Sequence, residues 1–171
     1  MRLLREIIGY IIGGALFVAA MPLLMWLISG RPQLWPAFCG VFGVVAALIA
    51  VAGLALSVWS IAYMRNKGDG NPMDAFGHEV APRTRHLMTD GPYRISRNPM
   101  LSGTFLYLIG WGFLLFTWQA AAFFAAFVAV MLLQVRSEER RLRRDFGDEY
   151  AEYCRRTGRF FPKRSHSRPI T

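Results

Sequence analysis

The chain passes from a polar loop into a long apolar segment at residues 91–100, which read GPYRISRNPM. Two prolines, a glycine, a tyrosine and two arginines stand together there. The segment that follows, residues 100–135, contains no Asp, Glu, Lys, Arg or His. A stiff polar stretch directly ahead of an apolar run indicates a site at a membrane surface, and we expect this one to hold a polar cofactor.

Apolar residues are clustered in the rest of the chain as well. Of its 171 residues, 54% are hydrophobic and 14% aromatic, which exceeds the apolar share of an ordinary soluble domain. Two further runs without charged residues or histidine cover residues 7–29 and 36–64. Each run is long enough for one helix across a bilayer core about 30 Å thick.

The run 100–135 is too long for a single crossing, because a helix of that length would reach roughly 54 Å. We therefore predict a turn at Thr117-Trp118-Gln119, where polar and interfacial side chains interrupt the aliphatic pattern. The predicted fold is all-α, a single integral membrane domain over residues 1–171 with about four transmembrane helices. The predicted spans are 7–29, 36–64, 100–117 and 119–135, with a cytoplasmic loop over 65–98 and a cytoplasmic helical tail over 136–171.

The basic residues lie on one side of this predicted topology. Two precede the first span, six lie in the loop and eleven in the tail, so an even number of crossings gathers nineteen of the twenty on one face. The positive-inside rule makes that face cytoplasmic, with both termini on it, and we expect a bacterial inner membrane. The net charge of +9 then indicates the lipid bilayer and its anionic headgroups as the partner, not nucleic acid.

Cysteine spacing predicts no metal site. Cys39 and Cys154 fall near opposite faces of the predicted membrane, so they form no internal disulfide, and no metal-type spacing exists. The chain also lacks the glycine-rich strand-to-helix turn of a dinucleotide-binding domain, which excludes a separate Rossmann domain.

The loop over residues 65–98 carries part of the candidate chemistry. It contains glycines, prolines and two of the three histidines, interspersed with apolar residues that favour burial. A structureless loop longer than about 12–15 residues is usually functional or disordered, and the apolar residues argue against disorder. We therefore expect this loop to fold over the cytoplasmic ends of the helices.

The tail predicts a charged helix with one apolar stripe. The stripe recurs every three or four residues at Leu142, Phe146, Tyr150 and Tyr153. Gly147 is expected to break the helix into two pieces. Ion pairs of the favourable i,i+4 polarity are predicted between Glu139 and Arg143 and between Glu152 and Arg156. The alternative for most of the arginines is a cationic helix lying on the membrane.

Two adjacent glutamates, Glu138 and Glu139, follow directly on the last predicted span. A carboxylate there lies opposite Asn98 and Pro99 if the last two spans form a hairpin. Such a site suits a ligand that is both cationic and polar. The alternative is a surface ion pair of Glu138 with a nearby arginine, which contributes only about 0–1 kcal/mol.

Two blocks of the sequence together resemble a known family. Residues 91–100 read Gly-Pro-Tyr-Arg-x-x-Arg-Asn-Pro-Met, and residues 136–153 read Arg-x-Glu-Glu-x-x-Leu-x-x-x-Phe-Gly-x-Glu-Tyr-x-x-Tyr. Their order around a helical hairpin resembles that of isoprenylcysteine carboxyl methyltransferases and of the related membrane phospholipid methyltransferases. The resemblance covers residues 65–162. It implies an integral membrane enzyme that transfers a methyl group from S-adenosyl-L-methionine to a lipophilic or lipidated acceptor.

The same resemblance implies that the cofactor lies at the cytoplasmic helix ends, under the loop and the tail. Carried over residue by residue, its contacts come from His78, Arg85, His86, Leu87, Met88, Tyr93, Asn98, Pro99, Met100, Leu101 and Glu138. In this arrangement Glu138 offsets the positive charge of the cofactor, and Tyr93 lines its adenine pocket. The carboxylate of the cofactor is met by Arg85 or Arg97. No catalytic residue is assigned, although a histidine of the loop is suited to accept a proton if the acceptor is an amine.

The acceptor stays open, because the chain departs from the family at three positions. Members usually have His at position 98 and often have Tyr at position 101, where this chain has Asn98 and Leu101. Gln134 stands where the eukaryotic carboxyl methyltransferases have a substrate-contacting Arg. Carboxylate O-methylation of the isoprenylcysteine type, N-methylation of a lipid amine and methylation of a thiol are all compatible with this pattern.

Two other classes of protein are alternatives to a methyltransferase. Membrane NAD(P)H-dependent reductases of the sterol-reductase type share a similar C-terminal design, but they are much longer and have more spans. A non-catalytic membrane module is the second alternative. A translocation path would be expected to place a charged residue inside a span, and none of the predicted spans contains one.

Overall fold

The structure is a computed structural model that describes residues 13–30, 32, 40–67 and 87–163. Every regular element in these ranges is helical, which confirms the all-α prediction. In chain order the elements are η1 (Ala15–Ala20), α2 (Met21–Ile28), α4 (Val41–Lys67), η2 (Gly91–Arg94), α5 (Pro99–Leu115) and α6 (Trp118–Arg156).

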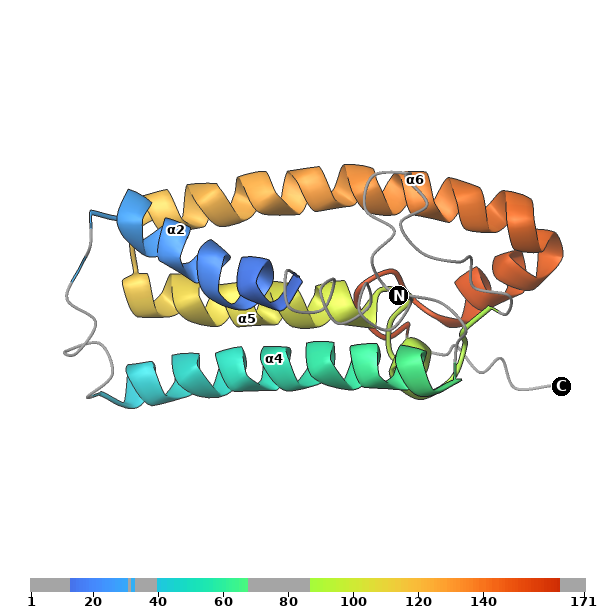
Figure 1. Cartoon of the computed structure of the whole chain (residues 1–171), viewed down its shortest axis with the longest axis horizontal. Coiled ribbons are helices and arrows are strands. Elements are labelled where there is room, and N and C mark those ends of the chain that lie inside the picture. Colours follow the sequence, from blue (N-terminus) through green and yellow to red (C-terminus); the bar gives the residue numbers. More distant parts are fainter. Residues whose placement is uncertain (1–12, 31, 33–39, 68–86, 164–171) are drawn as a thin grey trace, which may run out of the picture.

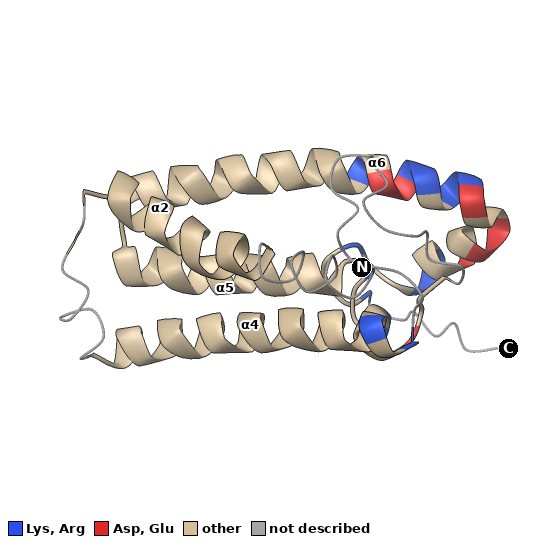
Figure 2. Cartoon of the chain, in the orientation of Figure 1, with Lys and Arg blue, Asp and Glu red and all other residues tan. Residues whose placement is uncertain are grey.

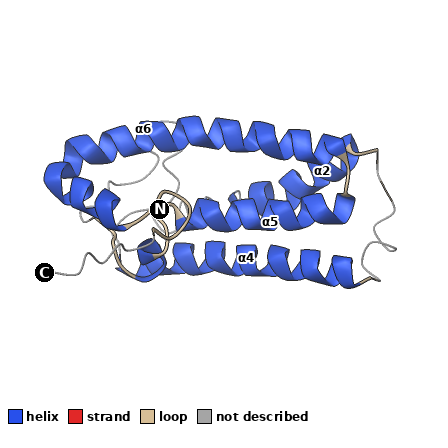
Figure 3. Ribbon diagram, turned by 180° about the vertical axis from the view of Figure 1, so that it is seen from behind, coloured by secondary structure: helices blue, strands red, loops and turns tan. Residues whose placement is uncertain are grey.

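The helices form one elongated bundle (Figure 1). α5 lies between α4 and α6, and α2 lies against both α5 and α6, as the view from behind also shows (Figure 3). The most extensive interface between two helices is that of α4 with α5. The bundle thus places the beginning of α5, the end of α4 and the polar half of α6 at the same end.

Two of the described helices, α4 and α6, are long and apolar enough to cross a membrane. α5 and the run Ala15–Ile28 are apolar but shorter, so the predicted count of four crossings stays a prediction. Figure 2 shows the described charged residues gathered at one end of the bundle, with the apolar lengths of the helices extending away from it. This separation agrees with charge-free spans that end at a single polar face.

The close approach of α4 to α5 depends on residues that have almost no side chain. A Cβ added to Gly103 would lie 2.5 Å from the carbonyl oxygen of Gly53 and 2.5 Å from Oγ of Ser57. A Cβ added to Gly110 would lie 2.7 Å from the carbonyl oxygen of Ala46. Small residues at helix interfaces let backbones approach closely in lipid. Gly53 and Gly103 therefore allow the two helix backbones to meet.

A backbone carbonyl four residues ahead of Pro22 accepts a hydrogen bond from α5. In an α-helix the Val18 carbonyl would accept from the N–H of residue 22, which proline lacks. The Tyr107 hydroxyl donates to this carbonyl oxygen instead, at 2.7 Å. The six residues directly ahead of α2 form the π-helical turn η1, so the irregular backbone lies on the N-terminal side of Pro22.

The hairpin of α5 and α6 turns where the sequence predicted it. Phe116 ends α5 in the left-handed conformation, with φ of 45°, and Thr117 is the N-cap residue of α6. The Thr117 side chain accepts a hydrogen bond from the Ala120 N–H at 3.3 Å. The two helices therefore run antiparallel, and the beginning of α5 faces the polar half of α6 (Figure 1).

α6 continues from its apolar half into the charged tail as one helix until Gly147. That residue has φ of 46° and ψ of −117°, which is not helical, so the predicted break is confirmed. Beyond the break the chain turns back toward the bundle (Figure 1). Residues 157–163, which we call the tail segment, thereby reach the beginning of α5, where the Arg97 N–H donates to the Gly158 carbonyl at 2.9 Å.

Candidate functional site

The stretch ahead of α5 is held in the short 3-10 turn η2. Pro92 and Tyr93 are buried in this turn, and the Tyr93 N–H donates to the Asp90 carbonyl at 3.0 Å. Gly91 has φ of 57°, and a Cβ there would lie 2.5 Å from the ring of Tyr63. Both facts require glycine at the start of the turn.

Tyr93 packs with Tyr150 and Tyr153 in a buried cluster at the polar end of the bundle. The Tyr153 hydroxyl donates to the Tyr93 carbonyl at 2.7 Å, which ties α6 to η2 across the break at Gly147. The partly buried side chains around this cluster are Tyr63, Met64, Leu87, Met88, Leu142, Phe146 and Cys154. The apolar stripe of the tail is thus confirmed, and it packs on the protein.

Glu138 lies close enough to this cluster for its charge to act on Tyr93. Burial raises the pKa of the Tyr93 hydroxyl, and the carboxylate of Glu138 raises it further. Burial also raises the pKa values of Tyr150 and Tyr153. The three phenols are therefore neutral at pH 7. The carboxylate of Glu138 acts on Tyr93, and a carboxylate near a neutral phenol favours a cationic ligand.

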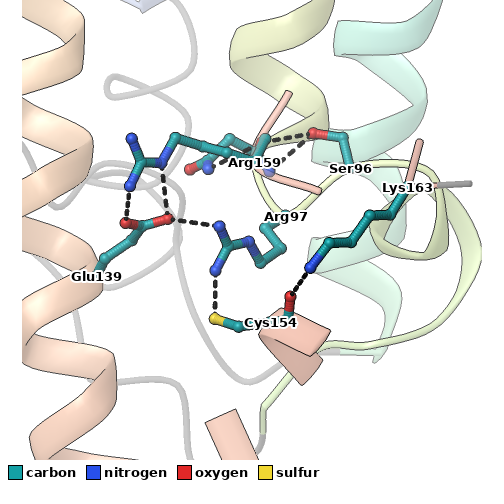
Figure 4. A network of polar contacts seen from close by, with 7 residues as sticks. Ser96, Arg97, Glu139, Cys154, Arg159 and Lys163 are labelled. Atoms are coloured by element: carbon teal, nitrogen blue, oxygen red, sulfur yellow. Dashed lines mark hydrogen bonds and ion pairs between the residues drawn. The ribbon is translucent and has the colours of Figure 1, made fainter. Parts of the chain in front are cut away.

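Glu139, the neighbour of Glu138, is only 7% exposed and lies in an ion cluster with Arg97 and Arg159 (Figure 4). Arg159 binds its carboxylate with two hydrogen bonds, from Nε at 3.0 Å and from Nη2 at 2.6 Å. Nη2 of Arg97 lies 3.2 Å from Oε1 of the same carboxylate. The predicted pair of Glu139 with Arg143 is therefore wrong, because two partners from distant parts of the chain reach the carboxylate with better geometry.

The tail segment is held on the beginning of α5 by its backbone as well. The Arg159 carbonyl accepts from Oγ of Ser96 at 2.9 Å and from both the backbone N–H and Nδ2 of Asn98, each at 3.2 Å. Oγ of Ser102 donates to the Phe160 carbonyl at 3.0 Å. The tail segment therefore closes one side of the polar end.

Arg97 has more contacts than its ion pair with Glu139. Its Nη1 donates to Sγ of Cys154 (Figure 4). Its guanidinium also lies 6.0 Å from the ring centre of Tyr150. Its Nε is buried and has no acceptor in the described part of the chain. A buried donor without a partner costs free energy, so this atom is suited to a ligand that carries an acceptor.

The eleven predicted cofactor contacts fall into three groups. His78, Arg85 and His86 lie outside the described residues, and their contacts stay predictions. Leu87, Met88, Tyr93 and Glu138 are brought together around the tyrosine cluster.

The third group lies at the N-terminus of α5. Asn98 is the N-cap residue of this helix, Pro99 is its buried first residue, and Met100 and Leu101 follow, both partly buried. The structure holds no ligand, so the roles of these residues as cofactor contacts also stay predictions.

Sequence reasoning did not identify Glu139, Arg159 and Cys154 as part of the site. The signal for Glu139 was present, because it adjoins Glu138, but adjacent residues on a helix point about 100° apart and the pattern did not separate them. Arg159 lies twenty residues beyond Glu139, too far for any helical spacing rule. Within the described residues, no group of three or more His, Cys, Asp or Glu side chains is placed to hold a metal ion.

The chain belongs to the phospholipid methyltransferase family, whose model matches residues 41–149. The match begins with α4, includes the turn η2 and all of α5, and ends in the polar half of α6. It confirms the resemblance stated from the two sequence blocks. Together with the apolar helices α4 and α6, the family indicates a membrane protein and an enzyme of the methyltransferase class.

Two curated relatives are similar over shorter stretches. The nickel-cobalt-cadmium resistance protein NccN of Alcaligenes xylosoxydans xylosoxydans is 36% identical over 84 residues, 48% of this chain and 39% of the relative. The cobalt-zinc-cadmium resistance protein CzcN of Cupriavidus metallidurans is 38% identical over 80 residues, 46% of this chain and 37% of the relative. The chain thus spans less than two-fifths of the length of these relatives. No solved structure matches the chain.

Proposed function

We propose that the protein transfers a methyl group from S-adenosyl-L-methionine to an amphipathic, lipid-like acceptor at the cytoplasmic face of a membrane. The observation that carries this proposal is that the charge of Glu138 reaches the buried Tyr93, at the polar end of a bundle that belongs to a methyltransferase family. A carboxylate next to neutral phenols suits the sulfonium and amino groups of such a donor.

The chemistry of the available donors and acceptors fits this group. Glu138 supplies negative charge for its cationic part, and the buried Nε of Arg97 lacks an acceptor, which the carboxylate of the methyl donor would provide. Leu87 and Met88 offer partly buried apolar surface beside Tyr93 for an adenine ring. The remaining predicted contacts from the loop, His78, Arg85 and His86, are retained in the proposal on the family resemblance alone.

When bound, S-adenosyl-L-methionine supplies an activated methyl group. The task of the protein is then to hold the donor and the nucleophile in line, because most of the acceleration of such a displacement comes from orientation. Glu138 and Tyr93 would orient the donor from α6 and from η2. A carboxylate acceptor needs no base, whereas an amine acceptor must first lose a proton.

The acceptor is proposed to reach the site from the bilayer. The apolar lengths of the helices meet the polar end directly, and many large apolar side chains on α4, including Val41, Leu48 and Val51, are exposed on the bundle surface. Carboxylate O-methylation and lipid N-methylation are both retained as reactions. The cytoplasmic orientation and the bacterial inner membrane rest on the distribution of the basic residues.

The test is binding of S-adenosylhomocysteine, the demethylated product, to the purified full-length protein in detergent by calorimetry. We expect saturable binding that Glu138→Gln weakens by about tenfold, because a hydrogen bond or ion pair to a charged group is removed. Glu152→Gln is the matched control, since this carboxylate lies on the same helix beyond the break and pairs with the exposed Arg155 and Arg156. A folded protein that binds no S-adenosylhomocysteine would exclude the proposal.

The acceptor can be identified in a second step. Purified protein is incubated with a lipid extract and methyl-labelled S-adenosyl-L-methionine, and the products are separated by mass. Label in an ester would indicate a carboxylate acceptor. Label that survives alkaline hydrolysis would indicate an amine or a thiol, and the mass of the product would distinguish these two. Binding of NADPH to the purified protein, together with no binding of S-adenosylhomocysteine, would instead support the reductase class.

A role in resistance to heavy metals is a further proposal, supported by the names of the two curated relatives. The chain belongs to a family of phospholipid methyltransferases, and this supports a contribution through modification of a membrane component. Growth of a deletion strain and of a strain carrying Glu138→Gln on graded cobalt, nickel and cadmium would test this. Equal growth of both strains and the parent would exclude it.

A further inference from the structure

The two adjacent glutamates of α6 lie in different surroundings. They point about 100° apart around the helix, on either side of the stripe formed by Leu142 and Phe146. Glu138 is partly exposed and acts on Tyr93, whereas Glu139 is 7% exposed and its two oxygens take three contacts from two guanidinium groups. The carboxylate of Glu139 is therefore already occupied by the protein itself.

The ion cluster of Glu139 joins three separate parts of the chain. Arg97 precedes α5, Glu139 belongs to α6, and Arg159 belongs to the tail segment (Figure 4). The backbone of Arg159 accepts from Asn98, the position at which the chain departs from the histidine usual in its family. The amide of Asn98 thus supports the same contact between the tail segment and α5 that Glu139 supports through its charge.

On the basis of the proposed function, we propose that Glu139 is a positioning residue for the methyl donor site. Its ion cluster holds the tail segment on the beginning of α5 and so fixes Glu138 and Tyr93 in the orientation that binds the donor. Glu139 itself does not touch the donor, because a ligand would have to displace Arg97 or Arg159 to reach it. The pair Glu138-Glu139 is thereby divided into one residue that binds and one that positions.

Cys154 gives a direct measure of this contact. Nη1 of Arg97 donates to its sulfur, and the thiol is partly buried under the ion cluster. If Glu139 loses its charge, Arg97 and Arg159 lose their shared partner and the tail segment opens more often. The rate at which a maleimide modifies Cys154 then rises. The chain has two cysteines, so a Cys39→Ser background confines the reaction to Cys154.

The experiment measures Cys154 modification and S-adenosylhomocysteine binding on the full chain in detergent. In Glu139→Gln we expect modification about tenfold faster and binding about ten- to a hundredfold weaker, because misplaced binding groups lose that much. Arg159→Gln should give the same two changes, although it lies twenty residues away from Glu139. Glu138→Gln should weaken binding and leave the modification rate unchanged.

Three results would overturn the proposal. Weaker binding in Glu139→Gln with unchanged modification and with normal binding in Arg159→Gln would make Glu139 a direct ligand. Faster modification with normal binding would make the ion cluster purely structural. The third result is a parent protein that binds no S-adenosylhomocysteine. That result would exclude both the proposed function and the positioning role. A faster modification of Cys154 in Glu139→Gln would still show that the ion cluster holds the tail segment on α5.

Conservative variants keep the test decisive if a glutamine variant does not fold. Glu139→Asp keeps the charge on a shorter side chain, and Arg159→Lys keeps the charge without the two-point contact. Both should fold, and both should show the two changes in the same direction and to a smaller extent. Parent-like values in both folded variants would contradict the positioning role.

Discussion

The interface between α4 and α5 is made by residues with almost no side chain, whereas the polar end of the bundle is held by long charged and aromatic ones. In the first region, Gly53 and Gly103 allow backbone to meet backbone, and no ionisable group takes part. In the second, one carboxylate and two guanidinium groups meet next to three buried phenols. The first region depends on shape and the second on charge, so different changes should break them.

The largest expected effect is that of Gly103→Ala, at the centre of the α4–α5 interface. The new methyl group would lie 2.5 Å from the Gly53 carbonyl oxygen, and neither backbone can move without separating the helices. We expect the free energy of unfolding to fall by about 3 kcal/mol. The measurement is unfolding by SDS in mixed micelles, followed by circular dichroism.

Gly112→Ala is the matched control on the same helix. The nearest atom to its Cβ would be Cε of Met25 at 3.8 Å, an ordinary contact. We expect no loss and at most a gain of about 1 kcal/mol from better helix propensity. Equal stability of the Gly103 and Gly112 variants would mean that the backbones of α4 and α5 are not in contact.

Glu139→Gln should have the next largest effect, on the polar region. Removing one member of a buried ion cluster leaves the others uncompensated, and we expect a loss of about 2–4 kcal/mol in the free energy of unfolding. Because Glu139 and Arg159 act on each other, the double variant Glu139→Gln/Arg159→Gln should lose less than the sum of the two single variants. Additive losses would contradict a shared contact.

The pH dependence of stability should differ between the two regions. The pKa values of Tyr93, Tyr150 and Tyr153 are raised above the ordinary value of 10.0, chiefly by burial. Above pH 10 the unfolded chain loses phenolic protons that the folded protein keeps, so the free energy of unfolding falls as pH rises. Each tyrosine contributes up to about 1.4 kcal/mol per pH unit.

The measurement is SDS unfolding in steps from pH 8 to pH 11, on the parent and on Tyr153→Phe. The variant should show a shallower decline above pH 10, because it lacks one of the three phenols. The loss caused by Gly103→Ala should stay the same at every pH. A decline that is as steep in Tyr153→Phe as in the parent would mean that this hydroxyl is not buried in solution.

Much of the fold followed from local pattern, because its causes are local. The turn at Thr117, the apolar stripe of the tail and the break at Gly147 each depend on residues within a few positions of one another. They were predicted from the sequence and are confirmed. The count of four crossings goes beyond the two long apolar helices α4 and α6, and it stays a prediction.

The site was predicted less completely, for a physical reason. Which glutamate of the pair turns inward depends on where the tail returns after Gly147, and no helical spacing contains that information. The i,i+4 rule predicted Glu139 with Arg143 and was wrong, whereas Arg159 offers a two-point contact to a carboxylate that is already partly dehydrated. The same rule predicted Glu152 with Arg156 and is confirmed, because no distant partner competes there.

A smaller effect is expected from Tyr107→Phe, which tests whether the apolar region depends on a single polar contact. The Tyr107 hydroxyl donates to the Val18 carbonyl, and Pro22 cannot supply the α-helical N–H to that carbonyl. We expect a loss of about 1 kcal/mol in the free energy of unfolding. In a Pro22→Ala background the backbone can supply the missing N–H, so the same substitution should cost less. Equal losses of unfolding free energy in both backgrounds would show that the contribution of the Tyr107 hydroxyl does not depend on Pro22.

The smallest effect is expected from Glu152→Gln, although Glu152 has two arginine partners just as Glu139 does. Hydrogen bonds from Arg155 and Arg156 lower the pKa of the Glu152 carboxyl group, so any contribution to stability would be present at neutral pH and lost as pH falls through that lowered value. All three side chains are solvated, and water and salt screen the pair. We therefore expect no resolvable shift of the SDS unfolding midpoint at pH 7 or pH 4. A loss as large as that of Glu139→Gln would mean that burial is not what distinguishes the two clusters.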